Sequence, residues 1–175
     1  MLEDRIKSVV RDVQDFPKPG IIFKDITPIL QHPALCRDIV EELRKTHEDL
    51  NVSTVLGVES RGFLYGVSLA TALNVPFAPV RKKGKLPYET VDFSYDLEYG
   101  SAEIEMHIDA VQPGDRVLIH DDLLATGGTA AAAAELVNKC GGEVVGFSFL
   151  IELMFLSGRS KLNSYGVNIS TLAAW

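Results

Sequence analysis

Two adjacent aspartates lie where their carboxylates could bind a sugar or a cation. Asp121 and Asp122 directly follow the apolar run RVLIH (116–120), which predicts a buried strand. Neighbouring acids in such a place repel each other unless a cation or hydroxyl groups engage them. Ribose hydroxyls and hydrated magnesium both suit the pair. We therefore expect a ligand at the end of this strand.

The turn that follows the acids could hold a phosphate group. It consists of Ala125, Thr126, Gly127, Gly128 and Thr129. Glycines let the backbone approach a ligand, threonine hydroxyls can donate hydrogen bonds, and the helix predicted at 130–139 would offer free N–H groups and the positive end of its dipole. A TGGT turn alone fits a simple helix cap equally well, but the two acids upstream favour an anion site.

Two basic segments could bind a polyanion. Glu59, Ser60, Arg61 and Gly62 follow the apolar run 54–58, which predicts a strand. Arg61 could hold a phosphate through two parallel hydrogen bonds, although a segment of this kind is more often an ordinary surface turn. The second segment is the basic cluster Arg81, Lys82, Lys83 and Lys85. Such a cluster is usually a solvated surface, but in an acidic chain it can also attract a polyanion.

The elements that must position these residues alternate between strands and helices, which predicts a mostly parallel sheet with helices on both faces. Apolar residues on one helical face are Leu2, Ile6, Val9, Val10 and Val13, and then, after Pro33, Leu35, Ile39, Val40 and Leu43. A further helix is predicted at 63–73, and further strands at 77–80, 104–108 and 143–153. The polar segment 82–93 is predicted as a long loop. Ligands of such sheets bind at the carboxyl ends of the strands.

Length and composition indicate one domain and exclude several classes of function. A net charge of -7 on 175 residues argues against non-specific nucleic-acid binding. No apolar run approaches the ~20 residues of a membrane span, and the N-terminus lacks the features of a signal peptide, which favours the cytoplasm. Cys36 and Cys140 are expected to be reduced and buried. The four histidines form no HxxxH pair, so zinc is not expected.

Five segments resemble the type I phosphoribosyltransferases, and among these the adenine-specific branch. VLIHDDLLATGGTA (117–130) resembles the signature that binds 5-phosphoribosyl-1-pyrophosphate (PRPP). FPKPGIIFKDITPIL (16–30) is similar to the base-binding region, and GVESRGFLYG (57–66) to the pyrophosphate-binding loop. PVRKKGKLP (79–87) and SYDLEYG (94–100) resemble the two ends of the catalytic loop. The matches follow the family's order and cover most of the chain.

The resemblance implies a fold and a reaction. The fold would be α/β, a type I phosphoribosyltransferase fold in a single domain (1–175), with a mostly parallel central sheet flanked by helices. It would carry a small N-terminal base-binding hood at 1–32 and a flexible catalytic loop at 82–100. The chain would join adenine to PRPP, giving AMP and pyrophosphate in purine salvage. Magnesium would be bound mainly through PRPP, pyrophosphate and water. The chain would form a homodimer, with the segment around Arg81 near the partner's site.

The resemblance also assigns roles to residues. Catalysis would fall to Glu98, Arg61 and Tyr99, with Glu98 near adenine N7, supporting proton movement as N9 attacks the ribose C1. Implied to bind PRPP or AMP are Asp121, Asp122, Ala125, Thr126, Gly127, Gly128, Thr129, Glu59, Ser60, Arg61, Arg81, Lys82 and Lys85. Implied to contact adenine are Phe23, Lys24, Ala125 and Leu153. Lys24 replaces the family's usual arginine, which keeps the charge but loses the planar fork.

Two other functions are compatible with parts of the sequence. One is a phosphoribosyltransferase for another base, such as hypoxanthine, xanthine or uracil, and the forms YDLEYG and DDLLATGG argue against it. The other is a non-catalytic regulator that senses PRPP. Such a regulator needs a nucleic-acid-binding domain or a basic face, and neither fits 175 residues with a net charge of -7.

Overall fold

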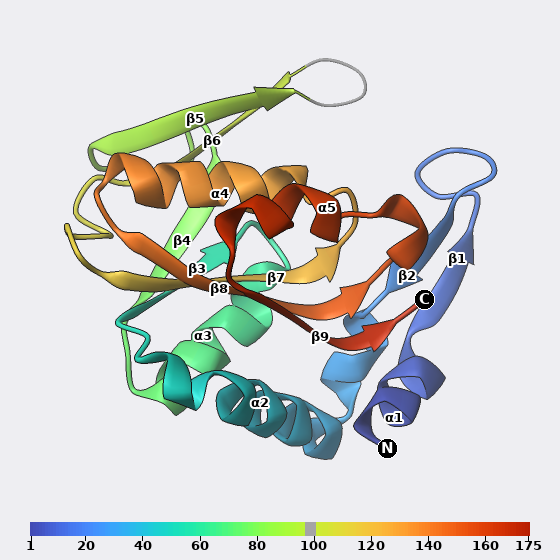
Figure 1. Ribbon diagram of the computed structural model, residues 1–175. Coiled ribbons are helices and arrows are strands. Elements are labelled where there is room, and N and C mark those ends of the chain that lie inside the picture. Colours follow the sequence, from blue (N-terminus) through green and yellow to red (C-terminus); the bar gives the residue numbers. More distant parts are fainter. Residues whose placement is uncertain (97–100) are drawn as a thin grey trace.

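The centre of the molecule is a seven-stranded sheet. The computed structural model describes residues 1–96 and 101–175, and its sheet has the order β5-β6-β4-β3-β7-β8-β9 (Figure 1). The strands are β3 (Thr54–Val58), β4 (Phe77–Lys82), β5 (Thr90–Asp96), β6 (Ser101–His107), β7 (Arg116–Leu124), β8 (Glu143–Glu152) and β9 (Asn168–Ala174). Strands β4, β3, β7, β8 and β9 are parallel, whereas β6 and β5 are antiparallel additions at the β4 edge. The mostly parallel α/β sheet is confirmed.

Helices cover both faces of the sheet. α4 (Gly128–Lys139) and α5 (Arg159–Leu162) lie on one face, and α1 (Leu2–Val9), α2 (Pro33–His47) and α3 (Gly62–Leu73) lie on the other (Figure 1). Successive residues of β7 alternate between the two cores, since Ile119 packs on the α4 side and Leu118 on the α2–α3 side. Burial on both faces explains why the central strands are continuous apolar runs. None of the helices in the described ranges is long and apolar enough to cross a membrane.

The N-terminal region forms a separate two-stranded hairpin, β1 (Arg11–Gln14) and β2 (Ile22–Asp25). The helix expected to continue to Val13 is wrong beyond Val9, because Val13 instead pairs with Phe23 across the hairpin. The β-branched valines of this segment suit a strand better than a helix. The hairpin tip points to the same side of the molecule as the far end of β5 (Figure 1).

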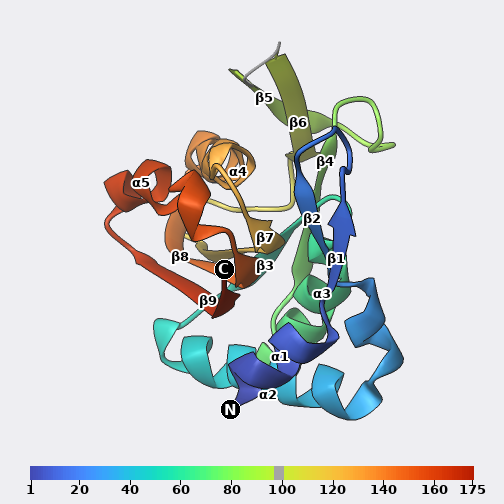
Figure 2. The ribbon, with the colours of Figure 1, turned by 90° about the vertical axis from the view of Figure 1, so that its right-hand side faces the viewer.

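Two other predicted boundaries are wrong. The segment 82–93 is not a loop throughout, because β5 begins at Thr90 and pairs with β6 along its whole length. Phe93 of β5 packs against the α4 core, so burial and strand pairing override a polar composition. The resulting hairpin extends beyond the body of the sheet (Figure 2). The strand predicted at 116–120 also continues through both acids to Leu124, which pairs with Glu152.

A row of buried or half-buried polar side chains crosses the sheet beneath α2 and α3. His120 of β7, Ser148 of β8 and Ser170 of β9 are register partners. His120 Nδ1 lies 3.1 Å from Ser148 Oγ, and Nε2 of His47, from α2, lies 2.8 Å from Ser170 Oγ. Burial, with a smaller effect of His47, lowers the pKa of His120 to about 3. Burial also lowers the pKa of His47. Both imidazoles are therefore neutral at physiological pH.

Candidate active site

The acid pair of β7 is joined to the neighbouring strand end through an arginine. Arg61 lies between β3 and α3, and its Nε is 2.9 Å from Asp122 Oδ2. The N–H of Asp122 donates a hydrogen bond of 2.8 Å to Asp121 Oδ1. Gly62 is needed beside them, because a Cβ at that position would lie 2.8 Å from the same carboxylate oxygen. Since β3 and β7 are parallel neighbours, their carboxyl ends bring Arg61 and both acids together.

The surroundings of the two acids raise their pKa values above the ordinary range. Burial raises the pKa of Asp121 well above its ordinary value, and the neighbouring charge of Asp122 raises it further. Burial also raises the pKa of Asp122, although Arg61 opposes this. Two carboxylates in such a place need hydrogen-bond donors to carry their full charge. Neighbouring hydroxyls of a ribose are donors of the right kind.

The turn expected to hold phosphate forms the N-terminus of α4. Gly127 precedes the helix with a φ of 78°, in the left-handed region that glycine adopts without strain. The first N–H groups of an α-helix have no partner within the helix, so they are free for an anion. The turn, together with Asp121 and Phe149, lines a cavity of about 70 Å³. Thr129 Oγ1 lies 3.0 Å from the hydroxyl of Tyr95, which comes from β5.

The basic cluster is gathered around one acid rather than free in solvent. Glu59 accepts hydrogen bonds from Arg81 Nε and Nη2 (3.3 and 3.1 Å), from the N–H of Lys82 (2.9 Å) and from Lys85 Nζ (3.3 Å). Burial alone would raise the pKa of Glu59, but these donors lower it to about 2. Glu59 and Arg81 line a cleft of about 480 Å³ that reaches Thr129 of the phosphate turn.

Lys83 does not join this group. Its Nζ lies 2.6 Å from Glu103 and 3.5 Å from Asp92, so its charge is balanced within the β5–β6 hairpin. Lys82 contributes its backbone N–H to Glu59, and its exposed side chain makes no ion pair within 1–96 and 101–175. Lys82, Arg81 and Lys85 therefore lie around Glu59 near the end of β4, whereas Lys83 is engaged in the hairpin.

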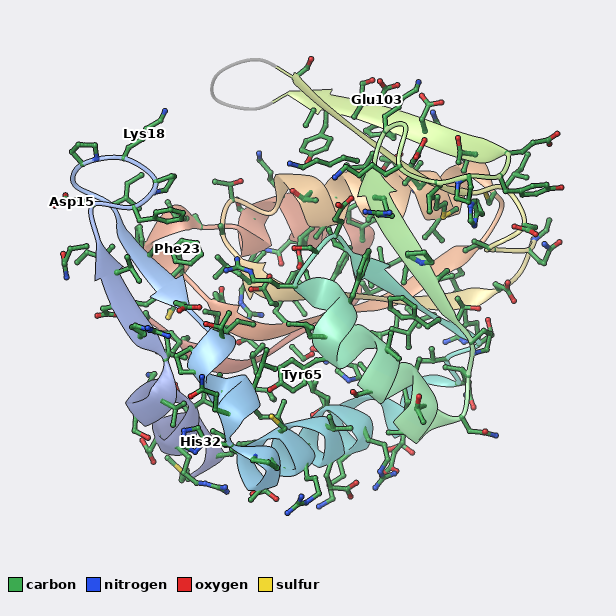
Figure 3. The ribbon with its side chains drawn as sticks, turned by 180° about the vertical axis from the view of Figure 1, so that it is seen from behind. Asp15, Lys18, Phe23, His32, Tyr65 and Glu103 are labelled. Atoms are coloured by element: carbon green, nitrogen blue, oxygen red, sulfur yellow. The ribbon has the colours of Figure 1, made fainter. Side chains whose placement is uncertain are left out.

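The hairpin carries the residues that the resemblance associates with the base. Phe23 lies on β2 (Figure 3), and the guanidinium of Arg61 stands 5.0 Å from the centre of its ring. Phe16 packs edge-on against Phe23 with ring centres 5.1 Å apart. Lys24 instead donates a 2.7 Å hydrogen bond to Asp12 and lies over the ring of Trp175. Its charge is thus already engaged within the protein, whereas Phe23 connects the hairpin to the acid pair through Arg61.

Of the other residues to which the resemblance assigns a role, some lie at the site and two lie outside the part of the chain that the structure describes. Leu153 follows β8, and its N–H donates a 3.0 Å hydrogen bond to the carbonyl of Leu124, so it lies beside Ala125. Ser60 is exposed next to Glu59. Glu98 and Tyr99 lie outside the described residues.

Three residues at the site were missed in the sequence. Tyr95 contacts the phosphate turn, and its position within SYDLEYG was the available signal. Gly158 touches the same turn, since a Cβ on it would lie 2.2 Å from the carbonyl oxygen of Ala125. Arg159 follows Gly158 and pairs with a buried acid at the end of β8. No pattern near positions 158 and 159 indicated that they approach the turn, because the contact spans more than thirty residues of chain.

An acid pair and a helix-terminal turn at the carboxyl ends of parallel strands define an α/β protein that binds a phosphorylated sugar. The sequence matches the phosphoribosyl transferase domain family over residues 25–166. Adenine phosphoribosyltransferase of Cytophaga hutchinsonii is 55% identical over 172 residues, covering 98% of this chain and 95% of that protein. The chain belongs to this family, and within it to the adenine phosphoribosyltransferases.

Solved structures agree with this placement. The crystal structure of adenine phosphoribosyltransferase from Rhodothermus marinus superposes with a TM-score of 0.94 at 54% identity, covering 99% of this chain and 98% of that one. The enzyme from Saccharomyces cerevisiae, crystallised with an imino-altritol bisphosphate and adenine, superposes with a TM-score of 0.90 at 40% identity, covering 98% of both chains. The recognised family and the α/β fold are therefore both confirmed.

Proposed function

We propose that this protein transfers the 5-phosphoribosyl group of PRPP to adenine, giving AMP and pyrophosphate in purine salvage. The observation that carries the proposal is the acid pair Asp121–Asp122 directly beside the N-terminal turn of α4. A ribose 5-phosphate needs acceptors for its hydroxyls and an anion site nearby, and the two features supply both. Adenine is favoured because the relatives that match nearly the whole chain carry that activity in their names, and the yeast enzyme was crystallised with adenine.

In this reaction the phosphate turn and the acid pair hold the sugar. Backbone N–H groups of residues 125–129 would bind the 5′-phosphate at the positive end of α4. Asp121 and Asp122 would accept hydrogen bonds from the ribose hydroxyls, which would stabilise their charged forms. The sugar becomes an oxocarbenium-like cation as the bond to pyrophosphate lengthens, so two carboxylates beneath the ring stabilise the transition state more than the ground state.

The departing pyrophosphate would be received by the cations at the ends of β3 and β4. Arg61, Arg81 and Lys85 lie on this side of the site, with Lys82 beside them, and Ser60 lies in the turn from which Arg61 projects. Arg81 and Lys85 would exchange their hydrogen bonds with Glu59 for bonds to the growing negative charge. Their guanidinium and ammonium groups would thereby stabilise the leaving group at the moment of bond cleavage.

The base would lie beneath the N-terminal hairpin. Phe23 presents an aromatic ring near Arg61, and Ala125 with Leu153 would form the opposite side of the base site. We assign Lys24 a supporting role, because its charge is paired with Asp12. The roles of Glu98 at adenine N7 and of Tyr99 in catalysis rest on the resemblance of SYDLEYG to the end of the family's catalytic loop.

Magnesium is proposed as the cofactor and would be held mainly by oxygens of PRPP or pyrophosphate and by water. In the described part of the chain, no group of three or more acid, histidine or cysteine side chains could hold a metal ion. The acids present fit an ion carried mainly by pyrophosphate oxygens and water, with few protein ligands. When bound, it supplies positive charge that neutralises the pyrophosphate.

We also propose a cytoplasmic homodimer. PRPP carries several negative charges and does not cross a bilayer, so its enzyme must work where PRPP is made. Cys36 and Cys140 are free thiols, half-buried rather than buried as expected.

Leu30, Leu64 and Val67 leave apolar surface exposed along a groove of about 570 Å³ between α2 and α3, which suits a subunit interface. Light scattering tests the dimer, with Val67→Glu as the variant expected to give monomers.

One experiment tests the activity. Protein, PRPP and magnesium are mixed with adenine, hypoxanthine, guanine or xanthine in turn, and the nucleotide formed is measured by chromatography. We expect AMP from adenine at a rate well above that of any other base. Faster turnover of another base would overturn the adenine assignment, and no nucleotide from any base would overturn the proposed reaction.

A further inference from the structure

A buried acid at the end of β8 is held by an arginine that lies outside the sheet. Glu152 is almost fully buried, and Arg159 of α5 donates to both of its carboxylate oxygens. Arg159 Nε lies 2.8 Å from Oε1 and 3.0 Å from Oε2, and Nη2 lies 2.8 Å from Oε2. The planar guanidinium matches the carboxylate with this fork, which a lysine cannot reproduce.

The same arginine also reaches the next strand. Its Nη1 donates a 2.8 Å hydrogen bond to the carbonyl of Ile169, and its Nη2 lies 3.1 Å from Thr171 Oγ1 on β9. Every nitrogen of the guanidinium therefore has a partner on β8 or β9. Separating Arg159 from the buried Glu152 would cost folding free energy, because the carboxylate would lose its charged partner. The ion pair therefore closes the short segment between these two residues into a loop.

This closed segment presses against the phosphate turn. A Cβ on Gly158 would lie 2.2 Å from the carbonyl oxygen of Ala125, and a Cβ on Gly127 would lie 2.5 Å from the carbonyl oxygen of Gly158. At its other end, the N–H of Leu153 donates a 3.0 Å hydrogen bond to Leu124. The backbone of 153–158 therefore contacts the backbone of 124–127 at two places, through Leu153 and through Gly158.

We propose that Arg159 is a positioning residue for the phosphate turn, acting through Glu152 and Gly158. This inference rests on the proposed function, since it assigns the turn to the 5′-phosphate. The ion pair fixes the backbone of Gly158, Gly158 sets the position of Ala125 and Gly127, and these in turn aim the first N–H groups of α4. A misplacement of about 1 Å at a binding group can cost about a hundredfold in rate, so the support matters.

Arg159→Met tests the proposal because it keeps most of the side-chain length and removes the guanidinium. Calorimetry measures the affinity for ribose 5-phosphate, which probes the turn and the acid pair, and separately for pyrophosphate with magnesium, which probes the β3 and β4 ends. The matched control is Arg116→Met. Arg116 pairs with Glu143 at 2.9 Å and donates hydrogen bonds to the carbonyl of Leu50. Its side chain is about as exposed as that of Arg159, and it lies at the end of β7 that is away from the site.

We expect Arg159→Met to weaken the affinity for ribose 5-phosphate by about tenfold or more and to leave the affinity for pyrophosphate within about twofold of wild type. Arg159→Lys should have an affinity for ribose 5-phosphate between those of wild type and Arg159→Met, because it restores the charge without the fork. Arg116→Met should lower the melting temperature and leave both affinities within about twofold. Unchanged ribose 5-phosphate affinity in Arg159→Met, or equal loss of both ligands, would overturn the proposal.

If Arg159→Met does not fold, Gly158→Ala carries the same test at the point of contact. A selective loss of ribose 5-phosphate in Gly158→Ala supports the proposal, and normal affinity overturns it. The outcome is separate from the fate of the proposed function. Wild-type protein that makes no AMP contradicts the function, whereas active wild type with a normal Arg159→Met contradicts the positioning role alone.

Discussion

Acidification should destabilise this protein through a histidine that is not at its surface. His120 is fully buried, its Nδ1 contacts Ser148, and its Nε2 has no hydrogen-bond partner in the described ranges. The groups that face or adjoin it are His47, along the same polar row, and Asp121, the next residue of β7. A proton added to His120 in the folded state would therefore be placed in a site that offers it no carboxylate partner of its own.

The magnitude follows from the two pKa values of this histidine. Its pKa is about 3 in the folded protein and 6.5 ordinarily. Between these values the unfolded chain binds a proton that the folded chain does not, so stability falls as the pH falls, by about 1.4 kcal/mol per pH unit. From pH 7.5 to pH 5 His120 alone should cost about 2 kcal/mol, or about 4–8 °C in melting temperature for a chain of this size. His47 acts in the same direction.

The assay is urea unfolding from pH 7.5 to pH 5 for wild type, His120→Asn and His32→Asn. Asparagine at 120 keeps a polar group near Ser148 but cannot titrate, so the variant should lose about 2 kcal/mol less than wild type over this range. His32→Asn is the matched control, because it removes an exposed histidine that lies outside the buried polar row. Equal slopes for wild type and His120→Asn, with both two-state, would refute the reasoning.

Further expectations concern the site. Asp121→Asn with Asp122→Asn should abolish useful PRPP binding by calorimetry while the melting curve still shows a folded protein, and unchanged affinity would contradict the role of the acids. Glu98→Gln should lower kcat by about 10²–10⁴-fold, more than it raises KM for adenine, and steady-state kinetics with an unchanged kcat would exclude a catalytic role. Glu59→Gln should release Arg81 and Lys85 and lower the inhibition constant of inorganic phosphate by about fivefold, and weaker inhibition by phosphate would count against the pairing described above.

Much of the fold was predictable because the central strands are buried on both faces. The apolar run at 54–58 coincides with β3, and the helix predicted after Pro33 begins at that residue. The failures occur where tertiary contacts decide. Val13 fits a helical face in sequence but pairs with Phe23 across the hairpin, and β5 is polar in composition yet is held by β6 and by the core beneath α4.

The site was predictable where its residues are adjacent in sequence and less so where they meet across the sheet. Asp121, Asp122 and the phosphate turn form one continuous segment, so their chemistry could be inferred directly. The pairing of Arg61 with Asp122 depends on the order of β3 and β7, which no local pattern contains. The approach of Gly158 to Ala125 likewise depends on a turn after β8 that has no signature of its own.

The carboxylate of Glu59 gives the resting protein an internal counter-ion, and this bears on selectivity among the anions of a cell. Because its pKa is about 2, it stays ionised and competes for Arg81 and Lys85 at every physiological pH. A singly charged anion that displaces it gains little, since it replaces one negative charge by another. A polyphosphate brings several charges and can engage these cations without losing that balance. We therefore expect this cluster to bind a diphosphate ester more tightly than a singly charged anion.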